Sequence, residues 1–109
     1  MDDLTSKKCV PCEDKDFPAL TGPQARGFLE HVPLWSLADD ASHIYRTFRF
    51  KNFADALIFV NRVGAIAEEE GHHPDIALAW GKVGITLTTH SIGGLSENDF
   101  IVAAKIDQI

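Results

Sequence analysis

Three of the five histidines in this sequence, His72, His73 and His90, could exchange protons with a bound molecule. An imidazole has an ordinary pKa of about 6.5, and a positioned acid or base speeds a reaction by about 10²–10⁴-fold. His72 and His73 are adjacent and precede Pro74, whereas His90 lies far along the chain. The adjacent pair alone is explained equally well as polar surface, so a functional site requires a fold that brings His90 to it.

Glu68 is a candidate for orienting one of these imidazoles. It opens a run of three carboxylates, Glu68, Glu69 and Glu70, in the last turn of a predicted helix. The helix dipole disfavours acidic residues at this end by about 0.3–1 kcal/mol each, so a compensating contact is expected. Glu68 lies at the edge of the buried face, one turn before His72, and we expect it to approach an imidazole. A solvated helix end is the better interpretation of Glu69 and Glu70.

Asp99 has a position that is compatible with two roles. It stands three residues after Ser96, a spacing typical of a capping box at the start of the final helix. The same helix start follows His90 through Gly93 and Gly94. We therefore expect the Asp99 carboxylate to cap the helix, and it could also approach His90.

Metal binding is the second hypothesis for an enzyme, because four of these residues are ligand types suited to zinc or iron: His72, His73, His90 and Glu68. Adjacent histidines on an extended segment point to opposite faces, so His72 and His73 cannot easily bind one ion. Cys9 and Cys12 form only half of a zinc site and are interpreted as reduced thiols. We therefore expect no bound metal.

The pattern of apolar residues predicts three helices and four strands in the order αββαββα. The helices are expected at about residues 21–31, 53–70 and from 96 towards the C-terminus, and the strands within 35–50 and 76–87. Asn52 is expected to cap the second helix, and Gly71 to end it. This helix should bury Phe53, Leu57, Val60, Gly64 and Ala67, flanked by Ala56, Phe59 and Val63, and expose Asp55, Arg62 and Glu69.

The register of the last two strands decides where the histidines meet. The turn between these strands is expected at residues 81–82, with Phe50 and Trp80 in the core. Extending the ladder from this turn sets His73 opposite His90. The sequence therefore predicts that His72, His73 and His90 share one site.

Composition restricts the class of protein. The chain has 109 residues, the size of one domain, and a net charge of −6, which disfavours nucleic-acid binding. Residues 1–20 lack regular periodicity and are expected to form an irregular arm before a single domain at residues 21–109. No apolar run approaches the roughly 20 residues that span a bilayer, and the N-terminus lacks the apolar stretch of a signal peptide. A soluble, cytosolic protein is expected.

These residues together resemble the pterin-4a-carbinolamine dehydratases, whose signature is an acidic residue, His-His-Pro, an aromatic residue, His and Asp. In this sequence it reads Glu68, His72-His73-Pro74, Trp80, His90 and Asp99. The similarity extends to residues 48–53, 89–90 and 93–96, and it covers most of residues 33–109. The one departure is Trp80, where the family more often has Tyr, and it affects no proposed catalytic group.

The resemblance implies an α+β fold with a four-stranded antiparallel sheet, helices on one face, and assembly into homodimers or homotetramers. It also implies a hydro-lyase, a 4a-hydroxytetrahydrobiopterin dehydratase, which converts the carbinolamine left by aromatic amino-acid hydroxylases to quinonoid dihydropterin without metal or organic cofactor. His72 and His90 would be the acid/base pair, His73 would help to bind the pterin, and Glu68 and Asp99 would orient imidazoles. Backbone near these histidines would hold the substrate, at His72, His73, Pro74, Thr89, His90, Ser91 and Ile92.

The resemblance also leaves a non-enzymatic alternative. Some family members act as dimerisation partners of a homeodomain transcription factor. An apolar stripe facing solvent on the final helix would favour such an interaction protein, whereas the His, Glu and Asp set favours catalysis.

Overall fold

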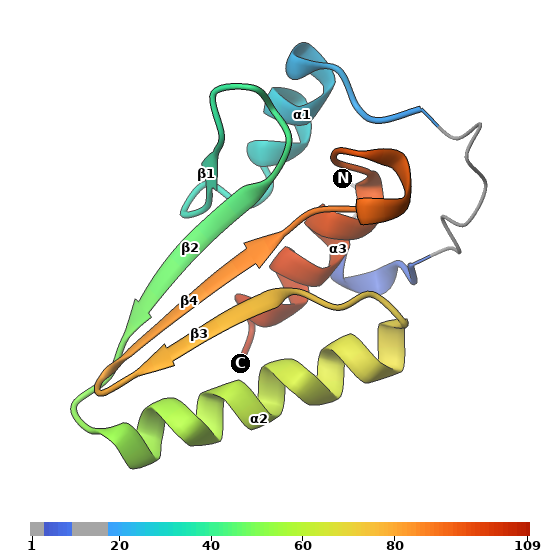
Figure 1. The fold of residues 1–109 in the computed structure, drawn as a ribbon. Coiled ribbons are helices and arrows are strands. Elements are labelled where there is room, and N and C mark those ends of the chain that lie inside the picture. The colour runs from blue at the N-terminus through green and yellow to red at the C-terminus, as the bar shows by residue number, and fades with distance from the viewer. Residues whose placement is uncertain (1–3, 10–17) are drawn as a thin grey trace.

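The computed structural model describes residues 4–9 and 18–109 as three α-helices, four strands and two short 3₁₀ helices. The arm contains one of the 3₁₀ helices, η1, and Cys12 lies outside the described residues. The order αββαββα is confirmed for the helices and strands of the domain (Figure 1). The elements are η1 (Leu4–Ser6), α1 (Gly22–Leu29), β1 (Ser36–Leu37), β2 (Ile44–Arg49), α2 (Phe53–Glu70), β3 (Asp75–Ala79), β4 (Lys82–Leu87), η2 (His90–Ile92) and α3 (Glu97–Ile106).

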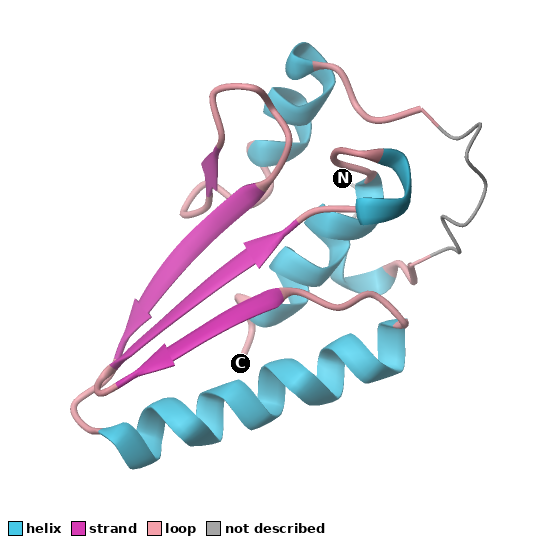
Figure 2. Cartoon of the chain, in the orientation of Figure 1, coloured by secondary structure: helices cyan, strands magenta, loops and turns pink. Residues whose placement is uncertain are grey.

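The four strands form one antiparallel sheet in the order β1-β2-β4-β3, which confirms the predicted α+β class (Figure 2). Along β4, Val83, Ile85 and Leu87 are buried and alternate with less buried positions. This alternation is expected when one face of a sheet is covered and the other meets solvent. In Figure 1, α2 runs beside β3, and α3 packs against α2 and the arm.

The final helix forms the centre of the core. Every residue of α3 except Glu97 and Lys105 is buried, including Phe100, Ile101 and Val102. A helix that is buried on nearly all sides must be enclosed by other elements, and α1, α2 and the arm all contact this one. Leu4 of the arm is itself part of this core. No helix among residues 4–9 and 18–109 is long and apolar enough to cross a membrane.

The buried face of α2 differs from the prediction. The buried side chains are Ala56, Phe59, Val63, Ala67 and Glu70, whereas the predicted Phe53 and Leu57 are exposed. Phe59 packs on Phe48 and Phe50, with ring centroids 4.6 and 5.1 Å apart. Apolar residues cover a broad arc of this helix, and the positions that are buried within it include the small Ala56 and Ala67 as well as Phe59. The central stripe was therefore predicted with the wrong rotation about the helix axis.

The predicted hairpin register is wrong by two residues. Ala79 pairs with Lys82, and Ile76 pairs with Ile85, so Trp80 and Gly81 form the turn. Gly81 has φ +66°. A Cβ added to it would lie only 2.8 Å from the carbonyl oxygen of Phe50. Only glycine fits this turn position, which moves the turn back by one residue. Trp80 is consequently 72% exposed and not in the core.

Replacing Gly81 by alanine should lower the free energy of unfolding by about 1–2 kcal/mol or more, because a left-handed backbone and a steric clash are added. Gly84→Ala is the matched control, since its Cβ would meet only the Ala77 Cβ at 3.8 Å. Urea unfolding of both variants measures the difference. Equal stability of the two variants would contradict the assigned turn.

Candidate active site

His72 lies in the short segment between the end of α2 and the start of β3. Gly71 adopts the expected left-handed conformation, with φ 65°, and the His72 N–H donates to the Ala67 carbonyl at 3.2 Å. These contacts are typical of a helix C-terminus and fix the backbone that carries the imidazole. The His72 side chain is 12% exposed, and its Nε2 lies 2.6 Å from Asp99 Oδ1. The α2 terminus therefore directs this histidine inwards.

Asp99 is fully buried at the start of α3. Its Oδ2 accepts hydrogen bonds from the Ser96 N–H at 3.0 Å and from the Thr89 hydroxyl at 2.8 Å. Ser96 and Asp99 form the predicted capping box. The imidazole that Asp99 meets is His72, however, whereas the sequence suggested His90. One carboxylate thus starts a helix and binds a histidine.

The hydrogen bond between these two residues has a defined direction. Asp99 accepts hydrogens from a backbone amide and a hydroxyl, so it acts as an acceptor towards His72 as well. His72 Nε2 then carries the hydrogen, and Nδ1 is left as the ring nitrogen without an assigned partner. A carboxylate that fixes the tautomer of an imidazole is a recurring arrangement in acid/base sites.

His73 and Glu68 form a second pair on the surface. His73 Nε2 contacts Glu68 Oε2, with the two side chains 61% and 79% exposed. Glu68 was expected to contact an imidazole, and the one it meets is His73. Water and salt screen a pair this exposed, so it contributes little to stability. His72 and His73 thus have different partners, as expected for adjacent residues on an extended segment.

His90 is exposed and begins η2 directly after Thr89. The corrected register does not set it opposite His73, because extending the ladder of β3 and β4 places His73 opposite Thr88. The segment of His90 instead meets that of His72 through Asp99, which binds His72 on one oxygen and Thr89 on the other. The route by which the two segments meet was therefore predicted incorrectly.

The other residues expected to hold substrate lie on the same two segments. Ser91 is exposed and Ile92 is half-buried in η2, where the Ile92 N–H donates to the Thr89 carbonyl at 3.2 Å. Pro74 is half-buried and precedes β3. Their contact with substrate stays a prediction.

Glu70 is a buried group that the sequence analysis placed wrongly in solvent. Its side chain is only 2% exposed, and Oε2 accepts from Lys105 Nζ at 2.5 Å while Oε1 accepts from the Cys9 N–H at 2.9 Å. It lies two residues before His72, and Lys105 lies on the same helix as Asp99. The Glu70–Lys105 and His72–Asp99 pairs therefore both connect the end of α2 to α3.

Burial and the neighbouring Glu70 carboxylate raise the pKa of the Cys9 thiol to about 12, so this thiol is a poor nucleophile.

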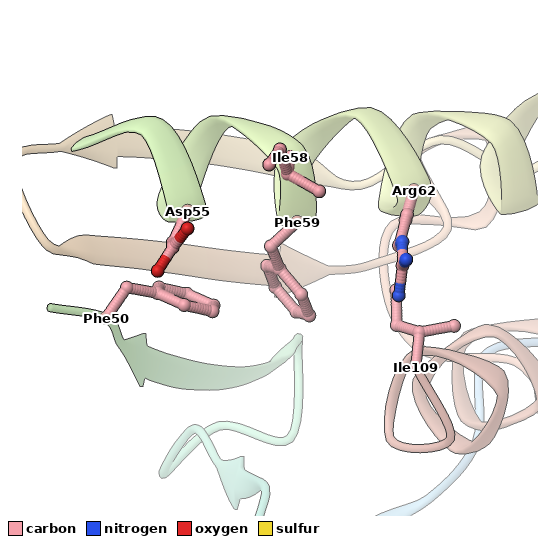
Figure 3. Close-up of a pocket in the computed structure, with 6 residues that line it drawn as sticks. All are labelled: Phe50, Asp55, Ile58, Phe59, Arg62 and Ile109. Atoms are coloured by element: carbon pink, nitrogen blue, oxygen red, sulfur yellow. The ribbon is translucent and has the colours of Figure 1, made fainter. Parts of the chain in front are cut away.

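The described residues show no metal-binding group at the histidines, and the pocket at α2 does not include them. Among residues 4–9 and 18–109, no three His, Cys, Asp or Glu side chains are grouped to hold a metal ion. A cavity of about 310 Å³ lies at the first turns of α2 (Figure 3), lined by Phe50, Asp55, Ile58, Phe59, Arg62 and Ile109. The site is thus defined by the hydrogen-bonded group around Asp99.

Known proteins share both the sequence and the fold. A protein of Methylococcus capsulatus, provisionally named pterin-4-alpha-carbinolamine dehydratase, is 51% identical over 106 residues, covering 97% of this chain and 92% of that protein. Pterin-4-alpha-carbinolamine dehydratase 2, mitochondrial, of Arabidopsis thaliana is 50% identical, covering 98% of this chain and 59% of that protein. A crystal structure of a transcriptional coactivator/pterin dehydratase from Brucella melitensis has a TM-score of 0.77 and 33% identity, covering 83% of this chain and 96% of that one.

A second solved structure belongs to a protein with another described role. It is a pterin dehydratase-like protein identified as a RuBisCO assembly factor in the alpha-carboxysome, with a TM-score of 0.59 and 28% identity, covering 68% of this chain and 86% of that one. A family model described as Pterin 4 alpha carbinolamine dehydratase matches residues 18–109. This range includes Asp99 and its hydrogen-bond partners His72, Thr89 and Ser96. This chain therefore belongs to the pterin 4 alpha carbinolamine dehydratase family, as its pattern of histidines and carboxylates predicts.

Proposed function

We propose that this protein dehydrates a 4a-hydroxytetrahydropterin to quinonoid dihydropterin by histidine acid/base catalysis, as a step of tetrahydropterin recycling. The observation that carries the proposal is the contact between His72 and the buried Asp99, with Nε2 and Oδ1 2.6 Å apart. Family membership supplies the substrate class. The proposal requires neither a metal nor an organic cofactor.

The chemistry needs only proton transfers. The C4a–O bond breaks as the lone pair of the adjacent ring nitrogen forms the new C=N bond, and the leaving hydroxyl takes a proton to depart as water. The ring then loses its N–H proton, so the products are quinonoid dihydropterin and one water molecule. A donor at the oxygen and an acceptor at the N–H are therefore sufficient.

The two candidate histidines suit different halves of this reaction. His72 is held with its hydrogen on Nε2, so Nδ1 can accept the N–H proton, and Asp99 stabilises the imidazolium that forms. His90 is exposed and can take up a proton from water and give it to the leaving hydroxyl. His73, placed by Glu68, and the backbone of residues 89–92 would hold the pterin ring.

The exposed apolar side chains bear on the expected partners. The alternative of an interaction protein called for an apolar stripe facing solvent on the final helix, but α3 is buried along nearly all its length. Exposed apolar residues lie instead on α2 and on the β3 hairpin: Phe53, Leu57, Ile58, Ile76 and Trp80. They support assembly of this chain into a homodimer or homotetramer, which stays a prediction, as does the cytosolic location.

Purified protein should accelerate the dehydration of a synthetic 4a-hydroxytetrahydropterin, followed by the absorbance of the quinonoid product. His72→Ala and His90→Ala should each slow turnover at least about tenfold, equivalent to about 1.4 kcal/mol. His31→Ala, an exposed histidine at the end of α1, is the matched control and should keep wild-type turnover. A wild-type protein that is inactive on all such carbinolamines would refute the proposed function.

A further inference from the structure

Thr89 has its side chain directed into the protein. The residue is 4% exposed, and its hydroxyl oxygen lies 2.8 Å from Asp99 Oδ2 and 2.8 Å from Ser96 Oγ. Its backbone N–H pairs with the Gly94 carbonyl at 2.8 Å. Both the backbone and the side chain of Thr89 are therefore held, whereas the next residue, His90, is exposed.

The hydrogen atoms in this group can be assigned from donor counts. Thr89 has one hydroxyl hydrogen, and Asp99 Oδ2 receives it. The contact between Thr89 and Ser96 must then be donated by the Ser96 hydroxyl. Asp99 Oδ2 thus receives two hydrogens, one from the Ser96 backbone and one from Thr89.

Two donors on one oxygen restrict the carboxylate more than one donor does. The Ser96 N–H alone restrains Oδ2 in one direction, so the carboxylate can still turn within the range that this hydrogen bond tolerates, and such a turn moves Oδ1 away from His72. The Thr89 hydroxyl provides a second fixed direction at Oδ2 and so determines the plane of the group. The Oδ1 atom is then directed at His72 Nε2, 2.6 Å away.

We infer that Thr89 is a positioning residue for the dehydration: its hydroxyl orients Asp99, which in turn keeps the His72 hydrogen on Nε2. This inference rests on the proposed function, and it assigns the Thr89 side chain to the catalytic step and not to substrate binding. A side chain that acts only on the reacting imidazole changes the rate of the chemical step more than it changes the binding of substrate.

Thr89→Val removes the hydroxyl and keeps the branched shape. Its kcat should fall about tenfold, with KM within about twofold of the wild-type value. In ¹⁵N NMR spectra, the His72 ring should shift from a predominantly Nε2–H tautomer towards a mixture of the two. Thr89→Ser retains the hydroxyl and should recover most of the kcat and the wild-type tautomer. Thr47→Val, an exposed threonine on β2, is the matched control.

Three results would overturn the inference: an unchanged kcat in Thr89→Val, a rise in KM alone, or an unaltered His72 tautomer. If the valine variant does not fold, Thr89→Ala is measured by the same NMR signals. The NMR result does not depend on turnover, so an inactive wild-type protein would refute the proposed function while Thr89 would still be tested.

Discussion

Replacing Asp99 by asparagine should lower kcat by about 10²-fold or more, although the side chain keeps its size. The Ser96 N–H is a fixed donor and requires an oxygen in front of it, at the position of Oδ2. The amide nitrogen of the asparagine must then take the position of Oδ1, facing His72 Nε2. Two donors cannot share a hydrogen bond, so His72 must move its hydrogen to Nδ1.

The consequence of this exchange is a wrong tautomer at the reacting nitrogen. Nδ1, which should accept the pterin N–H proton, would already carry a hydrogen, and the negative charge that stabilises the imidazolium would be gone. An Asp→Asn change of this kind in the serine protease triad costs about 10⁴-fold in kcat, and the present estimate is set below that value.

Steady-state kinetics on the 4a-hydroxytetrahydropterin measures the loss, and ¹⁵N NMR reports the His72 tautomer. Asp39→Asn, at an exposed position in the turn before β2, removes the same charge and should leave kcat within about twofold. An Asp99→Asn protein with wild-type turnover would show that His72 does not depend on this carboxylate.

Glu70→Gln should lower the free energy of unfolding by about 3 kcal/mol, because breaking one side of a buried ion pair leaves the other charge without its partner. The Glu70 carboxylate is 2% exposed and the Lys105 side chain 18% exposed, so neither can be fully rehydrated without movement. The change also weakens the link between the end of α2 and α3. Chemical denaturation measures the loss.

The same carboxylate makes stability depend on pH. Burial by itself would raise the pKa of Glu70, but the hydrogen bonds from Lys105 and the Cys9 N–H, with the Lys105 charge, lower it below the ordinary value of 4.5. An acid with a lowered pKa in the folded state stabilises above the ordinary value and loses this contribution as pH falls through the folded value. Below about pH 4.5, wild-type stability should therefore fall more steeply than that of Glu70→Gln.

Two controls separate the ion pair from general damage. Glu69→Gln changes the neighbouring, exposed carboxylate and should alter stability by less than about 0.5 kcal/mol. The double variant Glu70→Met with Lys105→Met should recover part of the loss, because an apolar pair replaces two buried charges. A Glu70→Gln protein within about 1 kcal/mol of wild type would contradict the assigned role of the pair.

Elements could be predicted from the sequence where their signals are local. Asn52 caps α2, with its Oδ1 2.7 Å from the Asp55 N–H, and Gly71 ends the helix with φ 65°. Ser96 and Asp99 form the capping box of α3. Each of these contacts joins residues within one helical turn, so the spacing of residue types is enough to predict them.

Contacts between distant residues could not be predicted in the same way. Glu70 accepts hydrogen bonds from Lys105, which is 35 residues away in the sequence, and from the Cys9 backbone, which is 61 residues away. No local sequence pattern therefore distinguishes the buried Glu70 from the exposed Glu69. The hairpin register has a similar cause. Moving the turn by one residue shifts the pairing by two and keeps every side chain on its face, so alternation cannot choose between the two registers. The Phe50 carbonyl beside Gly81 decides it.

The double use of Asp99 has a consequence for judging relatives of this chain. The start of the helix needs a side-chain oxygen acceptor at this position whether or not any reaction takes place, because that oxygen receives the Ser96 N–H. A descendant that abandoned dehydration for another task would still have reason to retain it. The imidazole at position 72 makes no such contact at the start of the helix, so on the proposed function its presence, and not that of the side chain at position 99, would separate active from inactive members.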